Sequence, residues 1–145
     1  MVLAMSFGLV LGLDRDFKNK PIDFRAYMIV CVTTCLLALL SQHMYHDLKN
    51  YDDFIKLDLG KIIAGALTGI GFLGAGAIVK REGDQIVGTA TGASVWAAGG
   101  IGLTIGFGAY SLAIIGFFVI AFILIAGGMY MDHFRSEDDK EDHPK

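Results

Sequence analysis

Apolar residues come in long blocks along this chain, and the polar residues are gathered in the gaps between them. Five apolar blocks cover residues 1–13, 26–42, 61–79, 86 to about 107, and 109–131. A helix of about 17–25 apolar residues can cross the hydrocarbon core of a bilayer, which is about 30 Å thick. The pattern therefore predicts an all-α membrane protein with about five transmembrane helices, the first of them short.

Composition supports this interpretation. Of the 145 residues, 54% are hydrophobic, and the mean hydropathy of +0.54 is too high for an ordinary soluble domain. One transmembrane domain, residues 1–131, takes up nearly the whole length. Residues 132–145 are highly charged and lack a hydrophobic period, so we expect a disordered or surface-lying cytoplasmic tail.

Glycine is concentrated in the middle of the chain, where all but five of the 19 glycines lie between Gly60 and Gly108. They stand among Ala, Ile, Leu, Val and Phe, a composition that excludes a flexible linker. Small residues spaced four apart let two membrane helices approach closely. We therefore predict that the third and fourth blocks form a closely packed helix pair, joined by a short polar turn at residues 80–85.

The candidate packing or partner groove consists of small residues on these two helices together with the single tryptophan: Gly65, Gly69, Gly71, Gly74, Gly76, Gly88, Gly92, Trp96, Gly102 and Gly106. Such a groove can serve folding, self-association or the binding of another protein, and the sequence leaves these alternatives open. The adjacent pair Gly99 and Gly100 permits either a kinked helix or a tight helix crossing. A phosphate-binding glycine loop is excluded, because neither the strand nor the helix that it requires flanks residues 71–76.

Acidic and basic residues are absent from the central parts of blocks two to five. Proton- or cation-coupled transporters usually carry such a residue within the bilayer, so this pattern disfavours transport. Charges instead gather after the first block, where Asp14, Arg15, Asp16 and Arg25 form the candidate charged cluster. Asp14 or Asp16 could pair with Arg25 and close that side of the protein; the alternative is that these charges only mark the membrane interface.

Other polar residues also have both a functional and a purely structural interpretation. His43, His46 and Asp47 could bind a cation, or they could belong to a solvated loop beside the membrane. Cys31 and Cys35 lie one helical turn apart inside an apolar block, which favours a packing role. We therefore expect no metal site and no cofactor.

Basic residues predict the orientation, because Lys and Arg are enriched in cytoplasmic loops. With the N-terminus outside, nine of the 12 Lys and Arg residues fall in cytoplasmic segments. The C-terminus is then cytoplasmic. The net charge of −3, without a basic patch interleaved with aromatic residues, argues against nucleic-acid binding. No nucleophile–base set is found, so we expect the protein not to be an enzyme.

Four stretches, in the same order, resemble motifs of one known family. Residues 69–78 read G-I-G-F-L-G-A-G-A-I and resemble the G-I-G-F-L-G-A-G-x-I motif of the MgtC/SapB membrane proteins. Residues 12–16 (G-L-D-R-D) are similar to the family's G-L-E-R-E. Residues 24–30 resemble its G-L-R-T-H-x-L-V, with Arg25 kept and Tyr27 at the His position, and residues 88–96 resemble its G-L-T-T-A-A-S-L-W.

This resemblance implies a bacterial inner-membrane protein associated with adaptation to low magnesium and, in intracellular pathogens, with virulence through survival in macrophages. It also implies a regulator of other membrane proteins, the ATP synthase among them. We expect a short form without the soluble C-terminal domain of longer members.

Two hypotheses follow from the sequence. The first is a non-enzymatic regulator that lies in membrane lipid and binds other membrane proteins, or further copies of itself, through the glycine grooves. The alternative is a transporter or channel for magnesium or another small ion.

Overall fold

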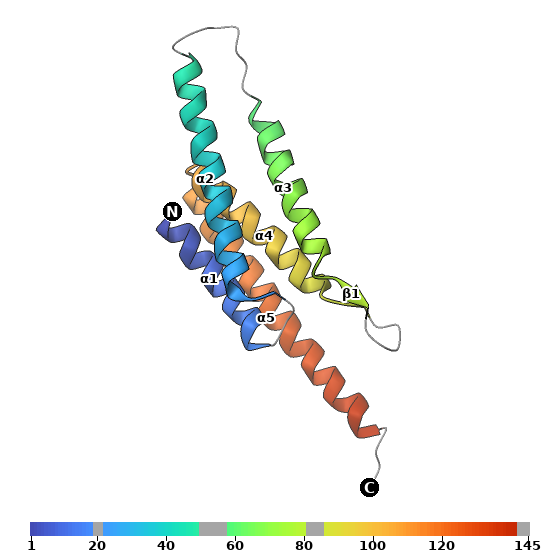
Figure 1. Cartoon of the computed structure of the whole chain (residues 1–145). Coiled ribbons are helices and arrows are strands. Elements are labelled where there is room, and N and C mark those ends of the chain that lie inside the picture. The colour runs from blue at the N-terminus through green and yellow to red at the C-terminus, as the bar shows by residue number, and fades with distance from the viewer. Residues whose placement is uncertain (19–21, 50–57, 81–85, 142–145) are drawn as a thin grey trace.

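The structure, a computed structural model, describes residues 1–18, 22–49, 58–80 and 86–141. These residues form helices and one short β-hairpin, in the order α1 (Val2–Phe17), α2 (Phe24–Lys49), α3 (Leu59–Ala75), β1 (Val79–Lys80), β2 (Ile86–Val87), α4 (Thr89–Gly106) and α5 (Tyr110–Glu141). Figure 1 shows the helices side by side in one elongated bundle, which α5 extends toward the C-terminus. The prediction of a mainly helical protein is confirmed.

Helix α4 is the centre of the bundle, where it contacts α1, α2, α3 and α5 (Figure 1). Its sequence contains no charged residue and is rich in glycine and alanine, so several neighbours can approach its backbone. Gly99 and Gly100 lie within this one helix, which runs without a break from Thr89 to Gly106. Of the two alternatives for this pair, the tight crossing fits, because a Cβ atom at Gly99 would overlap the side chain of Ile70 on α3.

The hairpin between α3 and α4 corrects the predicted ends of both helices. Helix α3 stops at Ala75 instead of residue 79, and α4 starts at Thr89 instead of residue 86. Val79 pairs with Val87, and Lys80 with Ile86, in an antiparallel ladder. The rest of the predicted turn, residues 81–85, lies outside the described residues.

Gly88 explains why the chain can pass from this hairpin into α4. Its φ is +94°, a left-handed conformation that glycine adopts without steric cost. A Cβ atom there would also overlap the carbonyl oxygen of Ala77. Residue 88 therefore forms the hairpin–helix junction. Glycine is needed there because of the backbone conformation and the nearby carbonyl oxygen of Ala77, and not because another helix packs against it.

Three helices are longer than predicted, and the first of them, α1, continues from residue 13 to Phe17. Helix α2 continues past residue 42 to Lys49, so His43, His46 and Asp47 belong to a helix instead of a loop. His43 and Asp47 face each other one turn apart, with Nε2 and Oδ2 separated by 3.3 Å. Helix α5 continues to Glu141, ten residues into the segment for which we expect a disordered or surface-lying tail. No glycine or proline interrupts this segment, and its Glu and Lys residues favour a helix.

Segments long and apolar enough to cross a membrane occur in α2, at Phe24–Asp47, and in α5, at Tyr110–Tyr130. Helix α3 is apolar but shorter. Along α5 most large apolar side chains are exposed, including Phe118 and Phe122, as expected for a helix that faces lipid. The count of five spans and their orientation stay predictions.

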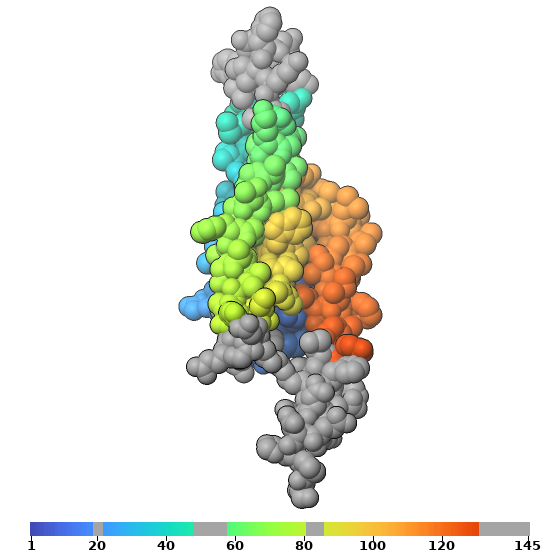
Figure 2. Space-filling view, turned by 90° about the vertical axis from the view of Figure 1, so that its right-hand side faces the viewer, coloured from blue at the N-terminus to red at the C-terminus, as the bar shows by residue number. Residues whose placement is uncertain are grey.

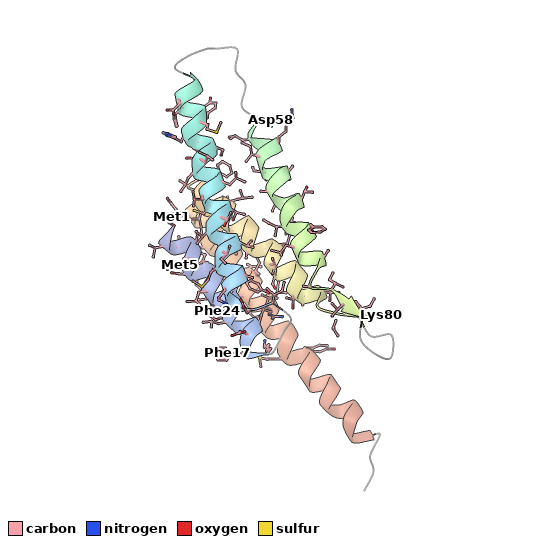
Figure 3. The ribbon with its side chains drawn as sticks, viewed as in Figure 1. Met1, Met5, Phe17, Phe24, Asp58 and Lys80 are labelled. Atoms are coloured by element: carbon pink, nitrogen blue, oxygen red, sulfur yellow. The ribbon has the colours of Figure 1, made fainter. Side chains whose placement is uncertain are left out.

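The two ends of the bundle differ in chemistry. Figure 3 places Phe17, Phe24 and Lys80 toward one end and Asp58 at the other end of α3. We call the first the charged end, because Asp14 and Arg15 of α1, and Lys18 at its C-cap, lie there beside the start of α2. Between the ends, α1 and α5 are joined by the stacked rings of Phe7 and Phe117, with centroids 4.1 Å apart.

Candidate functional site

Most glycines of the candidate groove fall into two groups, which differ in whether another helix packs against the glycine. The first group meets another helix. A Cβ atom at Gly74 of α3 would lie 2.9 Å from the carbonyl oxygen of Gly92 on α4, and one at Gly92 would lie 2.7 Å from the carbonyl oxygen of Gly74. The two backbones are therefore in direct contact, and neither position has room for a side chain.

Two further glycines of α4 contact α2. A Cβ atom at Gly102 would overlap the hydroxyl of Thr34 and the carbonyl oxygen of Cys31. One at Gly106 would lie 2.5 Å from the carbonyl oxygen of Cys35. Because Cys31 and Cys35 are themselves fully buried, these glycines fix how closely the core helices α2 and α4 approach.

The second group faces outward from α3. Among the described residues, no atom lies within 4 Å of a Cβ built on Gly65, Gly69 or Gly71. Gly65 and Gly69 are exposed on one side of the helix, beside Thr68 and Phe72, whose ring is 86% exposed. We call the surface formed by Gly65, Thr68, Gly69 and Phe72 the open face of α3. Figure 2 shows α3 along the outside of the molecule, with part of α4 visible between α3 and α5.

The two remaining members of the predicted groove have other places. Gly76 ends α3 as its C-cap, and its N–H donates to the carbonyl oxygen of Phe72, while the N–H of Ala77 donates to the carbonyl oxygen of Gly74. Trp96 is 48% exposed on α4 and does not belong to the buried core.

A buried hydrogen-bond network joins α2 to α4. The hydroxyl of Ser94 donates to the carbonyl oxygen of Thr91 at 2.9 Å, which leaves the hydroxyl of Tyr27 to donate to Ser94 Oγ at 2.8 Å. All three side chains are almost fully buried, and the described residues contain no buried side-chain nitrogen or oxygen without a hydrogen-bond partner. The network therefore holds a polar contact in the apolar interior without leaving an unsatisfied group.

The candidate charged cluster is arranged differently from the prediction. Arg15, 4% exposed, donates through Nε and Nη2 to Asp14 Oδ2 at 2.9 and 2.6 Å, and Lys18 Nζ lies 2.8 Å from Asp14 Oδ1. Arg15 Nη2 also donates to the carbonyl oxygen of Leu124 on α5 at 3.3 Å. The cluster thus fastens α1 to α5.

Arg25 takes no part in that contact. It pairs with Asp23 on the surface, with Nη2 and Oδ2 2.5 Å apart, so the alternative in which Asp14 or Asp16 pairs with Arg25 does not hold. The reason is local: Asp23 stands just before α2 and accepts hydrogen bonds from the Arg25 side chain and from the backbone N–H of Arg25 and Ala26. Asp16 is exposed on α1.

Charge at this end is set by these partners. Partial burial raises the pKa of Asp14, but the hydrogen bonds from Lys18 and Arg15 and the positive charges of both residues together lower it by more, and the pKa lies below its usual value. The hydrogen bond from Arg25 likewise lowers the pKa of Asp23. Both carboxyl groups are therefore ionised at neutral pH.

In the described part of the chain, no three His, Cys, Asp or Glu side chains come together. His43 and Asp47 are a simple exposed pair one turn apart.

Sequence reasoning missed Lys18 and the role of Tyr27. The spacing of Asp14 and Lys18, four residues apart on a helix, could have predicted their ion pair. The contact with the backbone of α5 could not have been found, because it depends on a residue more than a hundred positions away.

Comparison with known proteins decides the family. The model of the MgtC family matches residues 1–130, which is most of the chain and includes every residue of the glycine contacts and the charged cluster. The chain belongs to the MgtC family. The resemblance noted in the four motifs is therefore confirmed.

Relatives within the MgtC family include protein SapB of Bacillus subtilis, which is 38% identical over 125 residues, or 86% of this chain and 52% of SapB. The putative magnesium transporter YhiD of Escherichia coli is 33% identical over 116 residues, 80% of this chain and 53% of YhiD. Protein MgtC of Salmonella typhimurium is 30% identical over 114 residues, 79% of this chain and 45% of MgtC. This chain spans about half the length of these relatives. No solved structure matches it.

Proposed function

We propose that this MgtC-family protein is a non-enzymatic regulator, which lies in the bacterial inner membrane and binds other membrane proteins through the open face of α3. It crosses the membrane several times, with the N-terminus outside and the C-terminus in the cytoplasm. Its task is adaptation to low magnesium or to stress inside a host cell, as the family resemblance implies. The ATP synthase is a candidate partner on the same ground.

The observation that carries this proposal is the contrast between the two glycine groups. Gly74, Gly92, Gly102 and Gly106 are occupied by contacts inside the protein. Gly65 and Gly69 have the same spacing on an apolar helix, yet the described structure places nothing against them. In a bilayer such a face gains little from lipid and much from a second helix, because close backbone contact is the main attraction available there.

Transport of magnesium or another small ion is the alternative. It is favoured by the printed name of the Escherichia coli relative, a putative magnesium transporter. Against it, the buried polar side chains between the ends of the described bundle are hydroxyl-bearing residues that bind one another or their own helix. A coupled transporter usually places an ionisable side chain there.

A crosslinking experiment tests the proposal. A photoreactive phenylalanine analogue replaces Phe72 on the open face of α3 or, as a matched control, Phe122, an exposed phenylalanine on α5. In living cells we expect a discrete crosslink to another membrane protein from position 72 and none from position 122. Adding Gly65→Leu is expected to abolish the crosslink without lowering the thermal unfolding midpoint.

Flux through the purified protein separates the two functions. In liposomes we expect no cation flux above that of empty vesicles. Saturable magnesium flux, together with identical crosslinks from positions 72 and 122, would overturn the regulator in favour of the transporter.

A further inference from the structure

The seam between α1 and α5 at the charged end has an uneven distribution of charge. On the side facing α5, the carboxylate of Asp14 forms ion pairs with two cations, Arg15 and Lys18. On the side facing α2, the carboxylate of Asp23 holds Arg25, and Asp16 adds a second negative charge to that cation's surroundings. Among the side chains that the structure describes, the α5 side therefore carries one more positive charge than negative, and the α2 side the reverse.

The two cations at the α5 side do not have equal access to their surroundings. Arg15 is buried and donates hydrogen bonds to Asp14 and to the carbonyl oxygen of Leu124. The side chain of Lys18 is 27% exposed and meets Asp14 through one nitrogen that carries three donors. Lys18 is thus the group with capacity for a further acceptor, and Arg15 is a positioning residue that holds the shared carboxylate.

Helix α5 leaves room for the Lys18 ammonium. A Cβ atom at Gly128 would lie 2.8 Å from Lys18 Nζ, so the flexible end of Lys18 would have to shift to admit a side chain at this position. The neighbouring residues that face outward are large and apolar: Phe17 on α1, and Ile125 and Met129 on α5. The ammonium therefore sits where the apolar surface of the two helices gives way to the charged end, which is the depth of lipid phosphates.

We propose that the seam between α1 and α5 binds the phosphate of an anionic phospholipid, with Lys18 as the residue that contacts it. The phosphate balances the excess positive charge, and the acyl chains lie against Phe17, Ile125 and Met129. Basic pockets between membrane helices bind such headgroups in general. This inference rests on α1 and α5 lying in a bilayer, and it is independent of the proposed regulation of other proteins.

The test uses the purified full chain, stripped of lipid in mild detergent. Binding of phosphatidylglycerol and of phosphatidylcholine with the same acyl chains is measured by native mass spectrometry. We expect the wild type to prefer phosphatidylglycerol, and Lys18→Gln to reduce that preference about fivefold. Lys61→Gln is the matched control, because Lys61 is a lysine at the far end of α3, and it is expected to keep the preference unchanged.

Two further variants keep the test decisive if Lys18→Gln folds poorly. Lys18→Arg retains the cation and is expected to retain most of the preference, whereas Gly128→Leu takes up the space of the ammonium and is expected to weaken it. An equal preference in the wild type and Lys18→Gln, or none in the wild type, would overturn the proposal. Full competition by millimolar inorganic phosphate would show that the site takes free phosphate, which overturns the lipid as its ligand.

Discussion

Helices α3 and α4 carry the same kind of glycine spacing, yet the two helices use it in different ways. On α4, Gly92 and Gly102 meet the backbones of α3 and α2, with no space for a methyl group. On α3, Gly65 and Gly69 face outward, and the described residues leave the space beyond them open. A small-x-x-x-small motif thus marks a helix surface that another helix can approach closely. The position of the helix in the bundle decides whether a second helix of the same protein packs against that surface.

The largest expected effect comes from filling a packed glycine. Gly102→Leu should destabilise the protein by about 3 kcal/mol or more, because its side chain would collide with the backbone of α2, which cannot move aside. Gly116→Leu on α5 is the matched control, since no described atom lies within 4 Å of a Cβ there. The thermal unfolding midpoint in detergent measures both. Equal midpoints would show that α2 and α4 are not in contact at Gly102.

The ion pairs give a second contrast between a buried and an exposed contact. Arg15→Met should cost about 3 kcal/mol, because Arg15 is buried and its loss weakens the fastening of α1 to α5. Arg25→Met removes a cation whose pair with Asp23 is open to solvent, and no measurable change is expected. Unfolding in a denaturing detergent compares the two variants. A larger effect from Arg25→Met would reverse the assignment of the charged cluster.

The charged cluster should also respond to acid. The folded-state pKa of Asp14 is lowered, so its contribution to stability is present above the unfolded pKa of about 3.9 and is lost as the pH falls through the folded value. We expect the stability difference between the wild type and Asp14→Asn to be constant from pH 7 to pH 5. Below about pH 4 it should shrink. A difference that already disappears at pH 6 would show that Asp14 is not paired.

The smallest of these effects concerns the hydrogen-bond network. Tyr27→Phe removes the buried hydroxyl that meets Ser94, which should cost about 1 kcal/mol. Thr68→Ala on the open face of α3 removes a hydroxyl that bonds to its own helix, and should change stability by less than that. Thermal unfolding of the two variants provides the comparison. A greater loss from Thr68→Ala would place α3 inside the bundle.

Much of the fold follows from the hydropathy pattern alone. The five apolar blocks correspond to α1 to α5, because helices are the simplest way to satisfy the backbone of an apolar segment. The ends were less predictable. A polar residue does not stop a helix, so α2 runs on through His43 and Asp47, and α5 through its charged segment. The hairpin at Val79 and Ile86 was missed because its strands are two residues long.

The candidate site was predicted as a set of residues but not as an arrangement. The glycine spacing identified positions where helices can approach, yet it could not separate Gly69 from Gly74, which lie on different sides of α3. Nor could it show that Arg25 would be held by Asp23 next to it along the chain. Such choices depend on which helices are neighbours in space, and a single sequence contains no direct information on that.

The separation of packed from open glycines is tested most directly within one helix. Gly69→Leu and Gly74→Leu make the same change on opposite sides of α3, and the thermal unfolding midpoint of each is compared with the wild type. We expect Gly74→Leu to lower the midpoint by about 10 °C or more, because the new side chain meets the carbonyl of Gly92, and Gly69→Leu to leave it unchanged. Equal losses in the two variants would contradict the account.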